Sequence, residues 1–404
     1  MRVALATVGT TGDVAPFARL ASQLVGRGHE VTAVTWPVHR TALARPGVRV
    51  EVAGPHADAA RIAAVAADAV DRGPMDQVAV LRDFHLADGE AHYRRLCELL
   101  AGHDLVLLHG IHALAHAAAI DVGARWATAV FDPVLLPTSS APPPGMPNVG
   151  PMNRLAWWML DRALARAGRP LDDLLRRAGS RQRGLPLFRA RSGLLHLVGC
   201  SPSIIRVPPD LPPATIVTGA WLDRSAPPAL PDRVEAFLAE GAAPIVIAFG
   251  SMAGAPEDVI GAAVDAFLDA GRRVIVQGAL ARSVASPNLL RVEVLDHRAL
   301  FRPAGLVIHH GGAGTTHAAC AAGVPSLVVP HVGDQPYWAE RLHRLGVAPA
   351  PQPVRHLRAG QLAEAALAAV ADRDMHAAAQ ALGERIGQEH GLEAAVAAIE
   401  SAAG

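Results

Sequence analysis

Residues 307–342, VIHHGGAGTTHAACAAGVPSLVVPHVGDQPYWAERL, decide the fold expected for this chain. The apolar run at 305–308 is typical of a buried parallel strand. A glycine-rich turn at 309–316 follows it, and then an alanine-rich helical segment at 317–322. A second apolar run at 326–330 reads as another strand. The stretch therefore predicts a strand, turn, helix and strand unit of an α/β protein.

Two loops of this unit carry groups that suit a phosphorylated ligand. Thr315 and Thr316 stand where the helix N-cap is expected, and backbone N–H groups at a helix N-terminus suit a phosphate. The loop after the second strand carries Asp334 and Gln335, and open α/β sheets bind ligands outside the carboxyl ends of their strands. A carboxylate beside an amide offers acceptors and donors to sugar hydroxyls. Taken alone, the glycines also fit a merely structural turn.

A similar unit opens the chain. Residues 1–8 read as a buried strand, 9–16 as a turn, 17–27 as a helix and 30–35 as a second strand. This β-α-β order is typical of a doubly wound domain. The turn contains GTTGD and not GxGxxG, so the dinucleotide fingerprint is not satisfied.

The rest of the chain predicts two α/β domains. The proline-dense stretch 206–232 is stiff and extended, which favours an interdomain linker. We therefore expect an N-terminal domain at 1–205, a C-terminal domain at 233–385 and a terminal helix at 386–404. Further strands are expected at 48–52, 104–109, 127–131, 194–199, 245–249, 273–276 and 290–294, and further helices at 113–120, 153–166, 257–270, 362–370 and from 375 onward.

Length and composition narrow the class of protein to which the chain can belong. A length of 404 residues favours two domains. Basic and acidic residues both number 37, so the whole chain has no general attraction to nucleic acid or anionic lipid. Three widely spaced cysteines, Cys97, Cys200 and Cys320, fit neither a disulfide framework nor a metal site. No signal peptide and no membrane span are expected, so we expect a cytoplasmic protein.

The motifs closely resemble one known family. HHGGAGT followed by GVP and GDQ is similar to the donor signature of GT-B nucleotide-sugar glycosyltransferases, and GTTGDVAP at residues 9–16 resembles their N-terminal GTxGDVxP element. The likeness is greatest to bacterial enzymes that decorate glycopeptide and polyketide antibiotics. It implies two Rossmann-like doubly wound domains facing a cleft. It also implies inverting transfer of a sugar, expected to be a deoxysugar, from a dTDP- or UDP-sugar to a hydrophobic aglycone in secondary metabolism.

The resemblance also implies the residues of a donor site. His310 matches the histidine that contacts the diphosphate, and Ser251 lies in a turn near it, although alone it reads as a helix cap. Asp334 and Gln335 match the pair that holds the sugar. Base recognition is expected near Val294 and Leu295. The remaining residues of the predicted diphosphate site are His309, Gly311, Gly312, Gly314 and Thr315.

The chain departs from the plant relatives at two donor positions. Ala318 stands where they carry a ribose-binding glutamate, and the segment at 293–296 lacks their base-stacking tryptophan. A missing ribose clamp fits a dTDP donor, whose sugar lacks the 2′-hydroxyl, more easily than UDP. The family needs no metal and no cofactor besides the sugar nucleotide, and the histidines here show no metal-ligand spacing.

Acceptor chemistry requires a general base, because an alcohol or phenol loses its proton as it attacks the sugar. Asp13 sits at the carboxyl end of the first strand, where the resembled family places its candidate base, and His109 ends a later strand. A carboxylate–imidazole pair is a usable base near neutral pH. The alternatives are that Asp13 only caps the first helix and that His109 is an ordinary strand-end histidine.

Three further residues are acceptor-side candidates: Phe84, His112 and Trp157. At helical spacing the cluster around Trp157 equally fits ordinary core. Expected partners are a nucleotide sugar and a small hydrophobic acceptor, without nucleic acid, and a homodimer is an open expectation. Alternative functions are a sterol or lipid glucosyltransferase, which should show a membrane-docking patch, a sugar-nucleotide epimerase, and a non-catalytic partner protein.

Overall fold

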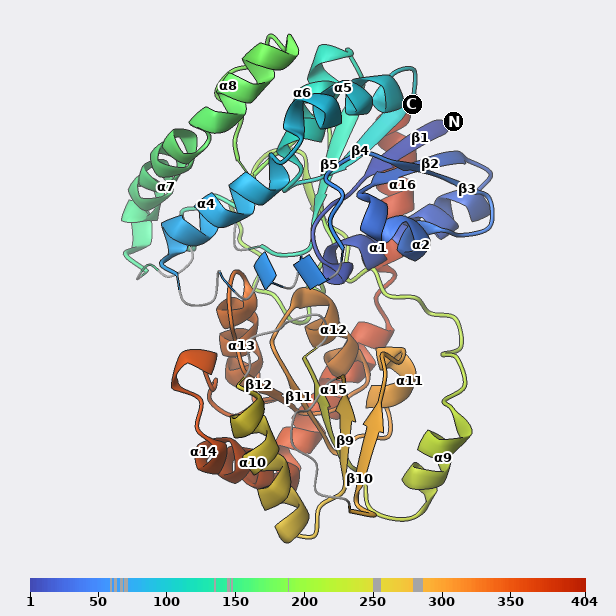
Figure 1. Cartoon of the computed structure of the whole chain (residues 1–404), viewed down its shortest axis with the longest axis vertical. Coiled ribbons are helices and arrows are strands. Elements are labelled where there is room, and N and C mark those ends of the chain that lie inside the picture. Colours follow the sequence, from blue (N-terminus) through green and yellow to red (C-terminus); the bar gives the residue numbers. More distant parts are fainter. Residues whose placement is uncertain are drawn as a thin grey trace. The chain divides into compact units, whose positions relative to one another are not determined.

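The computed structural model forms two compact units (Figure 1). One contains Met1–Val65, Arg72–Leu222 and His390–Gly404, and the other contains Asp223–Glu389. The structure describes residues 1–58, 60–61, 64–65, 68, 72–133, 136–143, 146, 148–187, 189–249, 256–278 and 286–404.

Unit 1 is built on a parallel sheet with seven strands in its described residues, in the order β3-β2-β1-β4-β5-β6-β7. The order reverses between β1 and β4, which is where doubly wound folds bind ligands. The strands are β1 (Arg2–Ala6), β2 (Glu30–Thr35), β3 (Val48–Val52), β4 (Leu105–His109), β5 (Trp126–Val130), β6 (His196–Val198) and β7 (Thr215–Val217).

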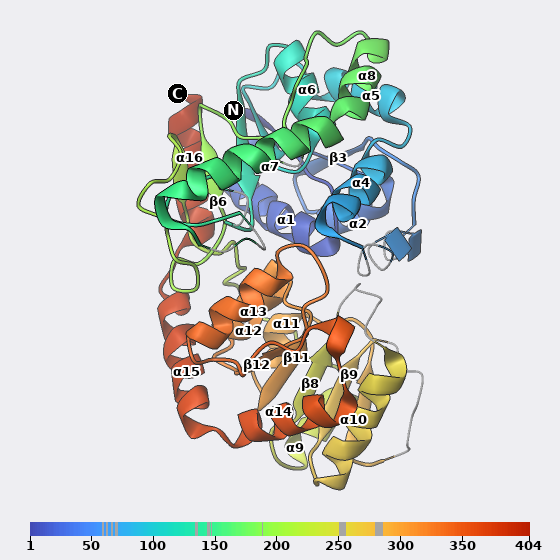
Figure 2. The same ribbon diagram turned by 90° about the vertical axis from the view of Figure 1, so that its left-hand side faces the viewer.

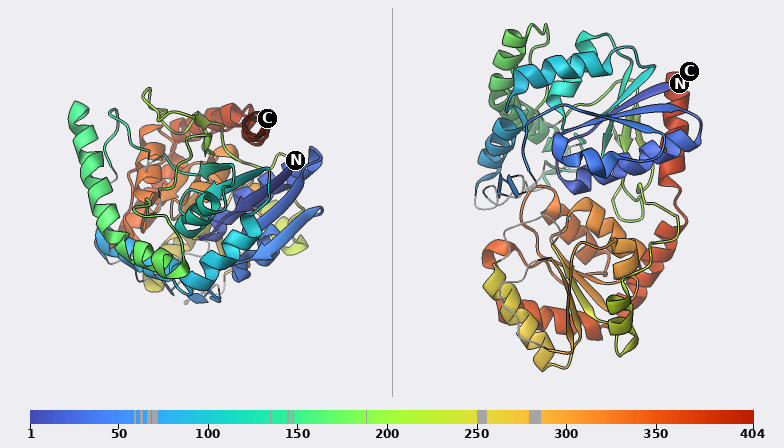
Figure 3. Two further views of the ribbon diagram at one scale, coloured as in Figure 1. Left: turned by 90° about the horizontal axis from the view of Figure 1, so that it is seen from above. Right: turned by 45° about the vertical axis from the view of Figure 1, so that its right-hand side comes forward.

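Helices flank the sheet of unit 1. Apolar side chains of α5, α6 and α8 pack with alternate residues of β1 and β4 in one core. The last helix of the chain, α16, packs against α1, and both chain ends lie in this unit (Figure 3). The helices are α1 (Thr11–Gly26), η1 (Pro37–His39), α2 (Arg40–Leu43), α4 (Pro74–His85), α5 (Gly89–Leu100), α6 (Ala113–Asp121), η2 (Gly150–Met152), α7 (Asn153–Ala167), α8 (Arg169–Ala178) and α16 (Gly391–Ala403).

Unit 2 repeats the same architecture with five parallel strands in its described residues, in the order β10-β9-β8-β11-β12. Its order reverses between β8 and β11. The elements are α9 (Asp232–Ala239), β8 (Ile245–Ala248), α10 (Glu257–Asp269), β9 (Val274–Gln277), β10 (Leu289–Val292), α11 (His297–Phe301), β11 (Leu306–His309), α12 (Ala313–Ala321), β12 (Ser326–Val328), α13 (Gln335–Arg344), η3 (Val354–His356), α14 (Ala359–Ala371) and α15 (Arg373–Gly387).

Strand alternation in unit 2 divides its core into two layers. Ile245 and Ile247 face a layer built from α10 and α14, whereas Val246 and Ala248 face a layer built from α9, α11 and α12. Successive side chains of a strand point to opposite faces, so a continuous apolar strand requires cover on both sides. The apolar runs in the sequence therefore predicted a doubly covered parallel sheet, and the structure confirms it.

Two predicted helix starts were wrong. α1 begins at Thr11 and not at 17, and α12 begins at Ala313 and not at 317. The N-cap of α12 is Gly312, so Thr315 and Thr316 lie inside the helix. In both cases a glycine, Gly12 or Gly314, lies in the first turn, where an unpaired N–H is normal, and in α1 the helix also continues through Pro16.

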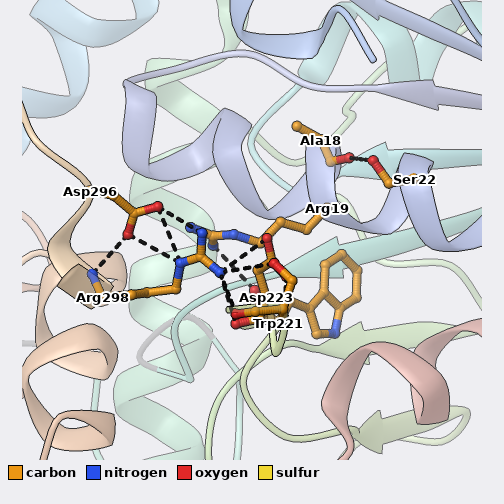
Figure 4. A network of polar contacts seen from close by, with 8 residues as sticks. Ala18, Arg19, Ser22, Trp221, Asp223, Asp296 and Arg298 are labelled. Carbon is orange, nitrogen blue, oxygen red and sulfur yellow. Dashed lines mark hydrogen bonds and ion pairs between the residues drawn. The ribbon is translucent and has the colours of Figure 1, made fainter. Parts of the chain in front are cut away.

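The stretch predicted as a linker contains a strand. β7 lies within 206–232 and joins the edge of the sheet of unit 1, and the division between the two units falls between Leu222 and Asp223. Arg298 anchors the start of unit 2, since its guanidinium lies 3.2 Å from an Asp223 carboxylate oxygen and also pairs with Asp296 (Figure 4).

Candidate active site

The glycine-rich turn places two histidines at the carboxyl end of β11. His309 is buried, and its Nδ1 accepts a hydrogen bond of 3.0 Å from the Gly311 N–H. A side chain at Gly312 would put its Cβ 2.5 Å from His310 Nε2, so the imidazole of His310 lies directly over this glycine. Gly311 has φ +87°, and a Cβ there would lie 2.7 Å from Val328. Both glycines are therefore required by the turn, and they bring backbone and imidazole together.

The first turn of α12 follows this turn at once. Gly314 and Thr315 lie in it, and the first intrahelical bond recorded runs from the Thr316 N–H to Gly312 O at 2.9 Å. Earlier N–H groups of a helix have no intrahelical acceptor, and the helix dipole makes this end favourable for an anion. The geometry is that of a phosphate-binding helix N-terminus next to an imidazole.

The loop after β12 is held by its own side chains. Gln335 is buried, and its Oε1 accepts from the N–H groups of His331 (2.8 Å) and Val332 (3.2 Å). Asp334 is the N-cap of α13, and its Oδ2 accepts from the indole N–H of Trp338 at 2.6 Å. The amide oxygen of Gln335 is thus engaged within the loop, which leaves its NH₂ group as the donor for a ligand hydroxyl.

The loop after β10 shows how the predicted base-binding residues lie. Val294 is 81% exposed, and the Leu295 N–H donates to Gln277 Oε1 at 3.2 Å. Asp296 caps α11 by accepting from the Arg298 N–H. Ser251 lies outside the described residues.

Buried histidine side chains lie close together at the carboxyl edge of the sheet of unit 2, and burial lowers their pKa values. Burial and the neighbouring imidazoles of His331 and His297 lower the pKa of His310 to about 3. Burial, helped by His310, lowers the pKa of His309 to about 3. Both are therefore neutral at pH 7. At this edge, among the described residues, three imidazole nitrogens are buried without a hydrogen-bond partner: His309 Nε2, His310 Nδ1 and His331 Nε2.

Unit 1 brings Asp13 and His109 together at its own switch point. His109 Nδ1 lies 3.1 Å from the carbonyl oxygen of Val8, so this nitrogen carries the proton and Nε2 is left as the basic atom. Nε2 lies 3.9 Å from Asp13 Oδ1. The His109 side chain is 4% exposed and that of Asp13 31%, so Asp13 is the accessible member.

The cap interpretation of Asp13 also holds. Its Oδ2 accepts from the Thr10 N–H at 2.7 Å and from the Thr10 hydroxyl at 2.9 Å, as in a capping box. A Cβ at Gly9 (φ +116°) would lie 2.4 Å from this oxygen. One carboxylate oxygen therefore fixes the helix start, and the other faces His109.

Aromatic rings enclose His109. Phe17 and Phe131 each lie with their ring centroids 5.6 Å from the imidazole, and Trp221 packs 5.1 Å from Phe131. Burial lowers the pKa of His109, while the carboxylate of Asp13 and the Val8 carbonyl raise it. The imidazole is therefore neutral and oriented.

The predicted acceptor residues lie apart from one another in unit 1. Phe84 is half-buried and packs edge-on against Trp36, with centroids 5.3 Å apart. His112 is buried at the N-cap of α6, 5.4 Å from the ring of His92. Trp157 is buried and donates from Nε1 to Ala141 O at 2.8 Å.

Sequence analysis did not identify several residues at the carboxyl ends of the strands of unit 2, where the donor is expected to bind. His331, His297 and Gln277 all follow or end strands of the sheet of unit 2, so inspecting every polar residue at a strand's carboxyl end would have found them. His317 of α12 and Trp338 of α13 pack against each other, with ring centroids 5.1 Å apart. Among the described residues, no group of three or more histidine, cysteine or acidic side chains is arranged to hold a metal ion.

Comparison with known proteins gives consistent matches. Residues 262–390 match the family described as the C-terminal domain of erythromycin biosynthesis protein CIII-like proteins. The chain is 32% identical over 424 residues to the O-mycaminosyltylonolide 6-deoxyallosyltransferase of Streptomyces fradiae, covering 99% of this chain and 97% of that protein. It is 32% identical over 368 residues to the vancomycin aglycone glucosyltransferase of Amycolatopsis orientalis, covering 86% and 85%.

A solved structure supports the fold. The spinosyn rhamnosyltransferase SpnG complexed with thymidine diphosphate superimposes with a TM-score of 0.68 at 20% identity, covering 99% of this chain and 100% of that one. The GT-B fold predicted from the motifs is thereby confirmed. The predicted enzyme class, a glycosyltransferase, is confirmed by the curated relatives. This chain belongs to the family of bacterial glycosyltransferases that act in antibiotic biosynthesis.

Proposed function

We propose that this enzyme transfers a deoxysugar from a dTDP-sugar to a hydrophobic natural-product aglycone of the polyketide class, with inversion at the anomeric carbon. The observation that carries the proposal is the first turn of α12, where backbone N–H groups and His310 converge on one position. Thymidine diphosphate is the ligand in the structure of SpnG. Over most of the chain, the relatives named as an O-mycaminosyltylonolide 6-deoxyallosyltransferase and a vancomycin aglycone glucosyltransferase are 32% identical, and a sterol glucosyltransferase is 27% identical, which favours a natural-product acceptor over a sterol.

Unit 2 would hold the donor. The α12 N-terminus and the neutral imidazole of His310 would meet the diphosphate, whose negative charge grows as it leaves. Asp334 and the Gln335 amide would bind sugar hydroxyls. The neutral imidazole of His310 would serve as a hydrogen-bond donor through its ring N–H.

Unit 1 would supply the base. The acceptor hydroxyl would meet Asp13, the accessible member of the pair, and its proton would pass to His109 Nε2. The freed oxygen would form the bond to the anomeric carbon as the bond to the diphosphate breaks. The imidazolium would then lie beside the Asp13 carboxylate and the Val8 carbonyl, both of which stabilise its charge.

Thermal stabilisation by nucleotides tests the donor assignment. A ligand that binds only the folded state raises the melting temperature as its concentration exceeds its Kd. We expect a rise with dTDP without added metal, a smaller one with UDP and none with GDP. The rise should disappear in His310→Ala/Thr315→Ala. No rise with any of the three would contradict the proposal.

A further inference from the structure

The helical hairpin α7–α8 and the segment after it carry an unusual charge for this chain. Residues 150–191 contain ten arginines and three aspartates, although the whole chain has equal numbers of basic and acidic residues. Whole-chain charge therefore conceals a basic region. Arg154, Arg162 and Arg166 are exposed along α7, which lies at the outer side of unit 1 away from β1–β3 (Figures 1 and 2).

The same helix exposes large apolar side chains. Met152 is 61% exposed, Leu155 48%, Trp158 53% and Met159 48%. Positions 155, 158, 159 and 162 fall on one helix face because they are three, four and seven residues apart. The opposite face holds the buried Trp157 and Leu164. A helix that covers the core on one side thus presents an apolar stripe flanked by arginines on the other.

A pocket opens beside this stripe. It has a volume of about 470 Å³ and is lined by Trp158, Asp161, Arg162, Arg189 and Arg191, among others. Arg189 pairs with Asp161, and the guanidinium of Arg162 lies 4.7 Å from the centre of the Trp158 ring. Three guanidinium groups with one carboxylate leave the pocket positive, which suits a phosphate group.

We propose that the exposed face of α7, with this pocket, binds the surface of an anionic phospholipid bilayer. Trp158, Met159 and Leu155 would enter the headgroup region. Arg162 and Arg191, the two exposed arginines of the pocket, would bind lipid phosphates. Amphipathic helices with arginines beside a tryptophan-containing apolar face bind in this way. α7 has 15 residues, so it would lie along the surface over about 22 Å.

Other occupants fit the face less well. A second copy of this chain would bring Arg154, Arg162 and Arg166 of one copy against the same residues of the other, which like-charge repulsion disfavours. Nucleic acid would contact the arginines but would leave the exposed leucine and methionine side chains without an apolar partner. A bilayer surface contacts both, since lipid phosphates bind the arginines and the apolar side chains enter the headgroup region. No helix among the described residues is long and apolar enough to cross a membrane, so the contact would be peripheral.

This inference rests on the proposed function only for the reason why the enzyme would bind a membrane surface. A hydrophobic aglycone partitions into bilayers, so an enzyme held at the surface meets a higher concentration of acceptor. A sterol or lipid glucosyltransferase would show such a surface as well, so the preference for a natural-product aglycone rests on the relatives and not on this surface.

Vesicle co-sedimentation tests the surface directly. The full chain, without substrate, is mixed with vesicles of phosphatidylcholine alone or with about one third phosphatidylglycerol. We expect binding to the anionic vesicles only, weakening as salt rises. Arg162→Gln/Arg166→Gln should lower the partition coefficient about fivefold for each arginine. Trp158→Gln/Met159→Gln should lower binding at both low and high salt, since it removes the apolar contact.

Matched controls separate the surface from general effects. Arg40→Gln/Arg45→Gln removes the same charge near α2 and should leave vesicle binding unchanged. All variants should keep the melting temperature and the dTDP response of the wild type. Equal binding to neutral vesicles, equal loss in the α2 control, or equally tight binding to a DNA duplex lost in the same α7 variants would overturn the proposal. Vesicle binding without any dTDP response would retain this surface and overturn the proposed donor site instead.

Discussion

The switch points of the two units have the same topology and opposite chemistry. In unit 1 the reversal between β1 and β4 brings a carboxylate to within 3.9 Å of an imidazole nitrogen. In unit 2 the reversal between β8 and β11 gathers imidazoles at a helix N-terminus, where burial, and then His331 and His297, lower the pKa of His310. One site is suited to accept a proton, and the other is suited to donate hydrogen bonds to an anion.

This difference shows that the fold supplies a position and the local residues decide its use. The Asp13 carboxylate offsets part of the burial that lowers the pKa of His109, so a ring that takes up a proton has a partner that stabilises its charge. Burial keeps the rings of His309 and His310 neutral. A neutral ring adds no positive charge at the N-terminus of α12, so the ring N–H and the backbone N–H groups can donate hydrogen bonds to the same anion. The donor and base roles are therefore separable by mutation.

The largest expected effect is on the chemical step. Asp13→Asn and His109→Asn should each lower kcat by about 10² to 10⁴, the range of general-base catalysis. The measurement is dTDP release from a dTDP-sugar with a macrolactone acceptor. Affinity for dTDP should not change, because the pair belongs to unit 1. If Asp13→Asn and His109→Asn also bind dTDP more weakly, the base and the donor site are not separate functions of the two switch points.

The second effect is on donor affinity. Gly312→Ala would place a Cβ 2.5 Å from His310 Nε2 and displace the ring. Loss of one hydrogen bond to a charged phosphate should weaken dTDP binding about 10- to 100-fold. Titration calorimetry measures it. Gly360→Ala is the matched control, since the first turn of α14 offers open space at Gly360, and it should bind dTDP normally.

Acid should destabilise the donor edge through its buried histidines. His309 and His310 have folded-state pKa values of about 3, below the ordinary value near 6.5. Below pH 6.5 the unfolded state binds more protons than the folded state, so stability is lost as pH falls. Between pH 6.5 and 5 each should cost about 2 kcal/mol.

Urea unfolding at the two pH values measures this loss. His309→Asn should be less stable than wild type at pH 7 but should lose less on acidification. An identical pH dependence in wild type and variant would show that the ring is not buried and neutral as described.

The smallest expected effect separates the two jobs of Asp13. Thr10→Ala removes the hydroxyl that donates to Asp13 Oδ2 and should cost about 1 kcal/mol of stability. Catalysis should change little, because Oδ1 still faces His109. Urea unfolding and kcat are measured on the same sample. A loss of kcat as large as that of Asp13→Asn would show that the cap, and not the charge, is what His109 requires.

The strands were predictable because each is a short apolar run that ends in a polar or glycine-rich turn. β4, β8 and β11 fall within one or two residues of the expected ranges. The starts of α1 and α12 were not predictable in the same way, since glycine is read as a helix breaker although Gly12 and Gly314 lie in first turns, and α1 also continues through Pro16.

The candidate site was predictable in part. The motifs locate His310 and Asp334, but the resemblance gives no information on which side-chain atoms the protein itself uses. Gln335 Oε1 and Asp13 Oδ2 are engaged by backbone N–H groups. Such engagement depends on loop geometry, which sequence spacing does not encode. The basic face of α7 was missed because charge was counted over the whole chain.

Hydrogen exchange with and without dTDP tests the central claim most directly. The account predicts that dTDP protects backbone amides at 311–316 and 331–335 and leaves those at 9–14 and 109–113 unchanged, because the donor belongs to the switch point of unit 2. Gly312→Ala should lose the protection at the same dTDP concentration. Protection of 9–14 without protection of 311–316 would contradict the assignment of donor and base to the two units.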